Sequence, residues 1–442
     1  MIRSARLLSF RSFNHALAAF ASDRAGATTL LIALTFTLLV GFAALGTEVS
    51  QWYSIRRTMQ GAADSAAYSA ATAKWNGASS AAYTSEAKSV TASYGFTDEV
   101  NGAVVTVNNP PASGSHTADG NAVEVLISRP QPLQLARMFL SGPPTLNTRA
   151  VATLNAGGNA CVLALDRGNV TDVSDNGNTT LNMNDCNLWV NSPSNSALTL
   201  NGQATINANA AFISGNYTTS GQASLNTTAG TFTGAAPAND PYADVSIPSY
   251  SGCNQTNYSL TGNAPPATFT PGSSGIMVFC NGLSVSGGNT VNLSPGTYII
   301  DRGSFSVTGG STIYAPSGVT IILTSSTGSD YATTSIAGGS DVTIVAPTSG
   351  PLSGLAIFQD RNAPQNANPT NSFTGGTTQK ITGTIYLPNQ GVTFNGGTTT
   401  GGARCTQLVA LTITFNGNAA FNNNCQGVGI RAAGGSFIQL VE

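Results

Sequence analysis

Charged side chains are scarce in this chain. Only 8% of its 442 residues are Asp, Glu, Lys or Arg, and the formal net charge is -2, whereas ordinary globular proteins are about 25% charged. Binding to nucleic-acid phosphates requires clustered Lys and Arg, so this composition argues against a nucleic-acid partner. Intrinsic disorder is also disfavoured, because a hydrophobic content of 41% does not match the polar, highly charged signature of disordered chains.

Common catalytic motifs are missing as well. The sequence contains no HExxH, no GxSxG, no phosphate-binding GxxxxGK[ST] and no calcium-binding GGxGxD repeat. The chain has two histidines. His15 precedes a long apolar run and His116 lies among Gly and Ser, so neither supports a catalytic triad with a cysteine. We therefore predict no catalytic, cofactor or metal-binding residues.

The remaining charges divide the chain into two parts. Residues 1–157 carry 11 basic and 8 acidic residues, a net charge of +3, whereas residues 158–442 carry 6 and 11, a net charge of -5. All six cysteines and most of the 40 asparagines fall in the second part. We therefore expect two different domains joined near residue 157.

An apolar run near the N-terminus predicts a membrane helix. Residues 25–47 carry no charge, and a helix of that length, about 35 Å, crosses a hydrocarbon core of about 30 Å. The basic residues of the leader, 1–24, outnumber those just after the run, which favours a cytoplasmic N-terminus. A cleaved signal peptide is the alternative, with Gly41-Phe42-Ala43 as the cleavage site. Both interpretations export the rest of the chain. Export favours disulfides among the cysteines.

The helix is expected to continue through residues 48–77, where the sequence resembles a known family. It reads GTEV at 46–49, QWY at 51–53, RR at 56–57 and MQGAADSAA at 59–67. This order is similar to the N-terminal segment of the Tad/Flp pilus-assembly proteins of the TadG-like class. In that class an acidic residue precedes an aromatic pair, basic residues and an Ala-rich helix. The resemblance places the family motif on Glu48, Trp52, Tyr53, Arg56, Gln60 and Asp64.

The sequence departs from the family pattern at three places. Glu48 stands where the family usually has Asp, and Leu31 stands where processed type IV pilins have Glu. Many TadG-like proteins also carry a DxSxS metal motif. The nearest run here, DVSDN at 172–176, lacks the last Ser and is interpreted as a turn.

The resemblance implies a role and a location. It implies a membrane-anchored, exported structural or adhesive component of a bacterial Tad (Flp, type IVc) pilus-assembly or secretion system, without catalytic activity. The implied partners are the inner membrane, other Tad/Flp components, and a surface polysaccharide or the pilus. The chain would cross the inner membrane once, with its bulk periplasmic or surface-exposed.

Residues 78–157 predict a small α+β region that is similar to the pilin-like plan of a long helix followed by a short sheet. Helical patterns cover 80–94 and 133–139, and alternating patterns predict strands at 103–107, 122–128 and 146–154. A domain this small is marginally stable alone, so we expect it to dock on the anchor helix or the next domain.

Internal repeats predict the fold of residues 158–442. Residues 201–215 align with 220–234 at an offset of 19, and 177–182 align with 202–207 at an offset of 25. Such periods are typical of stacked coils, so we expect a right-handed parallel β-helix (β-solenoid), with a β-sandwich as the alternative. The alignment predicts an interior row of Leu181, Ile206 and Leu225, and an amide ladder of Asn182, Asn207 and Asn226 at a bend.

Cysteine spacing agrees with coils of this length. The separations 161 to 186, 253 to 280 and 405 to 425 are 25, 27 and 20 residues. Although six cysteines allow 15 connectivities, we predict the three sequential pairs Cys161–Cys186, Cys253–Cys280 and Cys405–Cys425.

A second hypothesis is a carbohydrate-active β-helix enzyme, a polysaccharide lyase or hydrolase. Its candidate residues are three Asp-Arg pairs, Asp166-Arg167, Asp301-Arg302 and Asp360-Arg361. Neighbouring strand residues point to opposite faces, so a pair of this kind does not place both groups in one site. Structural ion pairs or turns are the favoured interpretation.

Overall fold

The structure is a computed structural model that describes residues 24–442 apart from 135, 139, 338, 375–376, 396–397, 400–402 and 423. The predicted leader therefore lies outside the described residues except for Arg24. The chain forms two compact units. One contains the described residues up to Leu154 together with Ile438–Glu442, and the other contains Asn155–Phe437. We call them the helix–sheet unit and the strand-rich unit.

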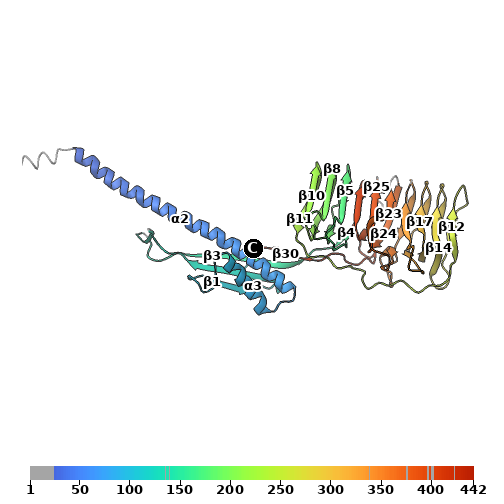
Figure 1. Cartoon of the computed structure of the whole chain (residues 1–442), viewed down its shortest axis with the longest axis horizontal. Helices are drawn as coiled ribbons and strands as arrows, with labels where there is room; N and C mark the ends of the chain where they lie inside the picture. Colours follow the sequence, from blue (N-terminus) through green and yellow to red (C-terminus); the bar gives the residue numbers. More distant parts are fainter. Residues whose placement is uncertain are drawn as a thin grey trace, which may run out of the picture. The chain divides into compact units, whose positions relative to one another are not determined.

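The helix–sheet unit is built on one long helix. α2 (Arg24–Trp75) is unbroken from the apolar run through the family-motif segment (Figure 1). Its first part exposes large apolar side chains such as Leu31, Phe36 and Phe42, which are 61–70% exposed. By length and composition, α2 is long and apolar enough to cross a membrane. α2 is thus a candidate membrane anchor.

The second half of α2 packs through alanine. Ala62, Ala63, Ala66, Ala67 and Ala70 are fully buried, and small side chains let helices and strands approach closely. They belong to one apolar cluster with side chains of α3 (Ser80–Ser93) and β2 (Ala122–Pro130). The Ser79 hydroxyl caps α3 by accepting from the Ala82 N–H at 3.3 Å.

A four-stranded sheet completes this unit. Its order is β1–β2–β3–β30, and β2 runs antiparallel to both β1 and β3. The remaining bounds are β1 (Val104–Asn108), η1 (Ala136–Met138), β3 (Thr145–Ala156) and β30 (Ser436–Leu440). The predicted strands and the predicted helix at 80–94 are present, with ends shifted by a few residues. Within the predicted helix 133–139, where residues 135 and 139 lie outside the described residues, the structure has the three-residue helix η1.

The C-terminal end differs from the predicted boundary of 158–442. Ile438–Glu442 belong to the helix–sheet unit, because β30 joins the sheet beside β3 and the Val151 N–H donates to the Glu442 carbonyl at 2.8 Å. Arg149 also forms an ion pair with the Glu442 side chain. The strand-rich unit is therefore inserted between two strands of the small sheet.

The strand-rich unit contains β4 to β29. The strands before residue 234 are β4 (Ala160–Ala164), β5 (Val173–Gly177), β6 (Thr180–Met183), β7 (Asn187–Val190), β8 (Leu198–Gly202), β9 (Thr205–Ile213), β10 (Tyr217–Gly221) and β11 (Ser224–Thr233). Those after residue 254 are β12 (Gln255–Leu260), β13 (Ala267–Phe269), β14 (Ile276–Val285), β15 (Thr290–Leu293), β16 (Gly296–Asp301), β17 (Ser304–Val307), β18 (Thr312–Ala315), β19 (Val319–Thr324), β20 (Thr333–Ile336), β21 (Asp341–Val345), β22 (Leu355–Gln359), β23 (Asn366–Thr374), β24 (Thr377–Leu387), β25 (Gln390–Asn395), β26 (Thr398–Thr399), β27 (Thr406–Ala410), β28 (Ile413–Asn416) and β29 (Ala419–Ala420).

Successive strands of this unit pass through three rows in turn. Strands of one row pair in parallel from repeat to repeat, as in β4–β7, β5–β8 and β6–β9. The long strands β9, β14 and β24 extend over two rows. The parallel pairing does not match the β-sandwich alternative, which is built from antiparallel sheets. Leu181, Ile206 and Leu225 share one register, as predicted.

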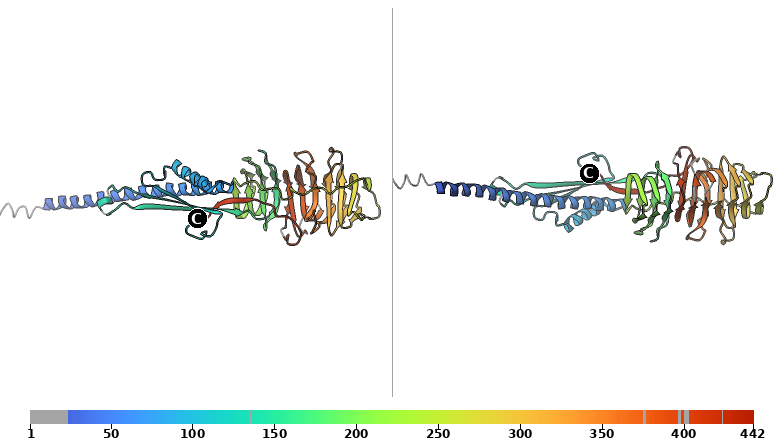
Figure 2. Two further views of the ribbon diagram at one scale, coloured as in Figure 1. Left: turned by 90° about the horizontal axis from the view of Figure 1, so that it is seen from below. Right: turned by 90° about the horizontal axis from the view of Figure 1, so that it is seen from above.

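The order of the repeats along the stack differs from their order in the sequence. The last repeat, β27 to β29, pairs with the first, β4 to β6. β10 and β11 therefore lie at one end of the stack and β12 and β13 at the other. In Figure 1 the red strands of the C-terminal part lie between the green and the yellow strands, and Figure 2 shows the same order from two further sides. Residues 234–254, which we call the crossing segment, connect the two ends.

The crossing segment covers one row from outside. The strands of that row, among them β4, β7, β19, β22 and β27, are buried on both faces. Tyr242 of the crossing segment is fully buried and belongs to one apolar cluster with Ile322, Phe358 and Tyr386 of that row. A second, interior cluster fills the space between the three rows and includes the stacked rings of Phe373, Phe394 and Phe415.

Candidate functional site

The acidic residue of the family motif anchors a loop to α2. Glu48 is 6% exposed, and its two carboxylate oxygens accept hydrogen bonds from the backbone N–H groups of Gln134 and Ala136, both at 2.8 Å. These donors stand at the start of η1, where a short helix leaves N–H groups without partners of its own. Glu48 therefore fixes the end of the apolar run to the helix–sheet unit.

Of the other motif residues, some contact the rest of the helix–sheet unit and others are exposed. The Gln60 side-chain amide donates to Asp64 at 2.8 Å and to the Arg149 carbonyl at 2.9 Å, which ties α2 to β3. Trp52 is half-buried, whereas Tyr53 is 72% exposed and Arg56 is also exposed. Tyr53 and Arg56 thus present an aromatic and a charged side chain that the unit itself does not bury.

The six cysteines form the three sequential pairs. Cα–Cα distances are 5.7 Å for Cys161–Cys186, 5.6 Å for Cys253–Cys280 and 4.9 Å for Cys405–Cys425. Cys161 on β4 and Cys186 just before β7 lie on adjacent strands of one row, as the repeat spacing predicts. Cys253–Cys280 joins the end of the crossing segment to β14.

The predicted amide ladder is confirmed, but it does not lie at a bend. Asn207 donates to Asn182 at 2.8 Å, and Asn226 donates to Asn207 at 3.0 Å. Asn182 of β6 and Asn226 of β11 are exposed, and Asn207 of β9 is half-buried. They point outward because they alternate with the interior Leu and Ile residues.

A second ladder crosses the junction between the last and first repeats. Asn416 donates to Asn395 at 3.0 Å, Asn176 donates to Asn416 at 3.3 Å, and Asn201 donates to Asn176 at 2.9 Å. Uncharged side chains therefore link strands that are 240 residues apart in the chain. The ladders explain how a surface poor in charge satisfies its polar groups.

The run DVSDN at 172–176 is not the predicted turn, because Val173–Gly177 form β5. Its carboxyl groups are buried: Asp172 is 1% exposed and Asp175 is fully buried. Burial raises the pKa of Asp172 to about 8 and that of Asp175 to about 6. In the part of the chain that the structure describes, no group of three or more His, Cys, Asp or Glu could hold a metal ion.

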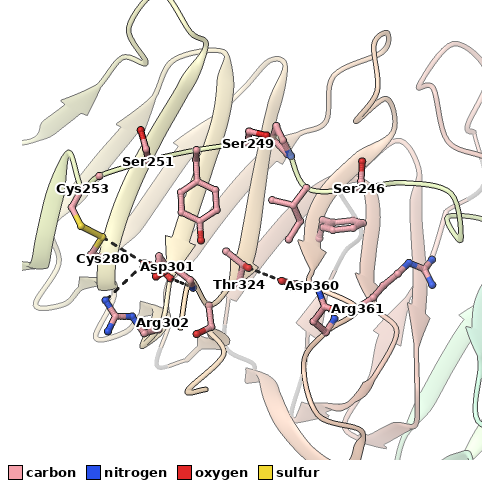
Figure 3. A pocket seen from close by; sticks show the side chains of 18 of the residues that line it. Ser246, Ser249, Ser251, Cys253, Cys280, Asp301, Arg302, Thr324, Asp360 and Arg361 are labelled. Carbon is pink, nitrogen blue, oxygen red and sulfur yellow. Dashed lines mark hydrogen bonds and ion pairs between the residues drawn. A yellow bond between two sulfur atoms is a disulfide. The ribbon is translucent and has the colours of Figure 1, made fainter. Parts of the chain in front are cut away.

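Beneath the crossing segment lies a pocket of about 810 Å³. Its floor is formed where three adjacent strands of one row end. Asp301 ends β16, Thr324 ends β19, and Asp360 follows β22. Figure 3 shows these three side chains next to one another, below the stretch that carries Ser246, Ser249 and Ser251. The same pocket is lined by Tyr250, whose pKa is raised by burial and by the negative charge of Asp301.

Local hydrogen bonds hold the two carboxylates. Asp301 accepts from the Ser326 N–H at 2.6 Å and from the Ser326 hydroxyl at 2.8 Å. Asp360 accepts from the Thr324 hydroxyl at 2.7 Å and from the Asn362 N–H at 2.8 Å. The crossing segment is held in turn by Asp240, which accepts from Arg361 and Tyr386.

Two of the three Asp-Arg pairs meet in this pocket, contrary to the expectation from strand alternation. Arg302 and Arg361 line it together with Asp301 and Asp360, because each pair lies at a strand end where the chain turns. Arg302 has a positive φ of 67°, and the backbone turns after Asp360 through a 3.1 Å hydrogen bond from the Ala363 N–H to its carbonyl. Asp166-Arg167 does not line this pocket.

Sequence reasoning missed the crossing segment and with it Tyr250, Thr324 and Ser326. One available signal was the continuous apolar character of runs such as VTIILT at 319–324 and LAIFQ at 355–359. Strands buried on both faces read this way. Alternation would have been expected had the outer face been open to solvent.

Comparisons with known proteins match the N-terminal segment. The Tad family, described as "Putative Flp pilus-assembly TadE/G-like", matches residues 26–73. No curated protein and no solved structure matches the chain. The match covers the apolar run, Glu48 and the Ala-rich half of α2, where the sequence resemblance was seen. Residues 26–73 are thus similar to the TadE/G-like segment of Flp pilus-assembly proteins.

Proposed function

We propose that this chain is a non-catalytic structural or adhesive component of a Tad pilus-assembly system, displayed outside the cytoplasm. The Tad segment carries the proposal, because it coincides with a helix whose apolar side chains are exposed. The arginines before the helix favour a cytoplasmic N-terminus. A single pass through the inner membrane would then export both units.

The strand-rich unit supports an extracytoplasmic role. Its three disulfides need an oxidising compartment to persist. Its parallel rows fit a right-handed β-helix, because crossovers between parallel strands are almost always right-handed. Insertion of this unit between β3 and β30 gives it two covalent connections to the anchored unit.

Deletion of the gene tests the role. We expect loss of piliation and of surface attachment, both restored by the full chain. A second complementing chain, with Leu154 joined to Ile438, removes the strand-rich unit and keeps the Tad segment. If it restores assembly but not attachment, the unit serves adhesion. Unchanged piliation and attachment after deletion would contradict the proposal.

A carbohydrate-active enzyme is the second candidate, because Asp301 and Asp360 share one pocket with two guanidinium groups. Their environment favours the non-catalytic proposal. Both carboxylates are almost fully buried, at 3% and 8% exposed, and each accepts two hydrogen bonds from its own chain. Turnover of an acidic polysaccharide that disappears in Asp360→Ala would favour the enzyme.

A further inference from the structure

The geometry points to a saccharide-binding site in the pocket beneath the crossing segment. This inference rests on the proposed surface role and names the ligand class that such a role would use. The pocket, of about 810 Å³, falls within the range of roughly 300–1,000 Å³ that is usual for ligand sites. It lies wholly within the strand-rich unit.

The floor of the pocket offers hydrogen-bond acceptors held in fixed positions. Asp301 and Asp360 lie two strands apart, which places their backbones about 10 Å from each other. Among the described residues Asp360 has no ion-pair partner, and the nearest guanidinium to Asp301, that of Arg302, is 3.8 Å away. Each carboxylate accepts two hydrogen bonds from the chain, which orient it. The small exposed fractions, 3% for Asp301 and 8% for Asp360, border the pocket, and lone pairs remain there for a ligand.

The edges of the pocket offer donors. The side chains of Arg302 and Arg361 are about a third exposed, at 31% and 32%, and both line the pocket. A guanidinium carries five N–H donors, so its accessible N–H groups can bind oxygen atoms of a ligand. Arg361 is fixed by its ion pair with Asp240 at 2.8 Å and by its position over the Tyr386 ring.

The presence of carboxylates and guanidinium groups in one pocket favours an uncharged ligand that is rich in hydroxyl groups. Asp301 and Asp360 would repel a polyanion, and Arg302 and Arg361 would repel a polycation. A hydroxyl group both donates and accepts, so a chain of hydroxyls can meet alternating carboxylates and guanidiniums without a net charge. The Tyr250 ring adds an amphipathic surface beside the floor. A saccharide, which carries many hydroxyl groups, fits all of these.

Binding can be tested on the full chain in detergent micelles. The protein is applied to an array of neutral saccharides, and the Kd of the best-bound one is measured by calorimetry. Asp360→Asn keeps the acceptor for Thr324 but removes the charge, and Arg302→Asn suits the positive φ at that position. Arg404→Asn, an exposed arginine that does not line this pocket, is the matched control. Melting temperatures verify folding.

We expect at least one saccharide to bind, at least tenfold more weakly to Asp360→Asn and Arg302→Asn, with Arg404→Asn unchanged. An array without binding at millimolar protein, or equal Kd values for both folded pocket variants and the unaltered chain, would overturn the inference. The proposed function is tested separately by piliation. An empty array with lost piliation after deletion would remove only the saccharide site, whereas binding with normal piliation would remove only the pilus role.

Discussion

Asp175 makes the stability of the strand-rich unit depend on pH. Its carboxyl group lies in the interior row, in register with Phe415 and Leu200, and accepts a hydrogen bond from the Thr179 hydroxyl. Burial raises its pKa from the usual 3.8 to about 6. Because the folded state binds this proton more tightly, the stabilisation is complete below pH 3.8 and is lost as pH rises through 6.

The size of the effect follows from the two pKa values. Their difference of about 2.2 corresponds to about 3 kcal/mol at roughly 1.36 kcal/mol for each pKa unit. Asp175→Asn keeps an oxygen for Thr179 and removes the titration. At pH 7 we therefore expect the variant to be about 3 kcal/mol more stable than the unaltered chain, and equal to it near pH 4. At about 2 °C for each kcal/mol, Tm should rise by roughly 6 °C.

Scanning calorimetry of both proteins from pH 4 to 8 measures this. Asp330→Asn, at an exposed position with positive φ, is the control and should leave the pH dependence unchanged. A Tm difference that does not vary with pH, or a variant less stable than the unaltered chain at pH 7, would refute the reasoning. The pKa of Asp172 is raised to about 8. In both proteins the stability of the folded unit should therefore decline further as pH rises toward 8.

Three other changes have defined outcomes. Glu48→Ala leaves two N–H donors without their acceptor and should lower the free energy of unfolding of the helix–sheet unit by roughly 2 kcal/mol. Thermal melts in detergent measure this change. An unchanged melt would contradict the anchoring role of Glu48. Asn207→Ala removes two ladder hydrogen bonds and Asn226→Ala removes one. The decrease in Tm should therefore be about twice as large for Asn207→Ala as for Asn226→Ala. Equal decreases would show that the ladder bonds do not stabilise the unit. Replacing both Cys253 and Cys280 by Ala frees the end of the crossing segment and should lower the free energy of unfolding by about 3 kcal/mol. Limited proteolysis should then cut the crossing segment faster. Equal proteolysis rates would show that the disulfide does not hold the segment.

Local patterns in the sequence predicted the repeats, but they did not predict which repeats that are distant in the chain pair with one another. The equivalence of Leu181, Ile206 and Leu225 follows from alignment, because a repeat that stacks on the next must place similar residues in register. The pairing of β28 with β5 joins Phe415 to Asp175, and no local pattern relates residues so far apart. The same limit applies to β30, whose place beside β3 depends on contacts made only in the folded unit.

The candidate site was predicted in its residues and missed in its arrangement. The Asp-Arg pairs were identified as candidates, but strand alternation separated their side chains. The turn at Arg302, with its positive φ, brings both members of the pair to the pocket. The segment that resembles the Tad family was located correctly, yet the role of Glu48 as an acceptor for the loop before η1 required the folded positions of Gln134 and Ala136.

We propose that α2 holds the strand-rich unit on the outer side of the inner membrane. Protease added to spheroplasts tests it directly, with an epitope tag at each end of the chain and a cytoplasmic protein as the control for lysis. We expect the chain to sediment with the inner membrane, the C-terminal tag to be lost, and the N-terminal tag to remain with a fragment that contains α2. A chain found in the soluble fraction, or a C-terminal tag protected until the membrane is broken, would contradict the account.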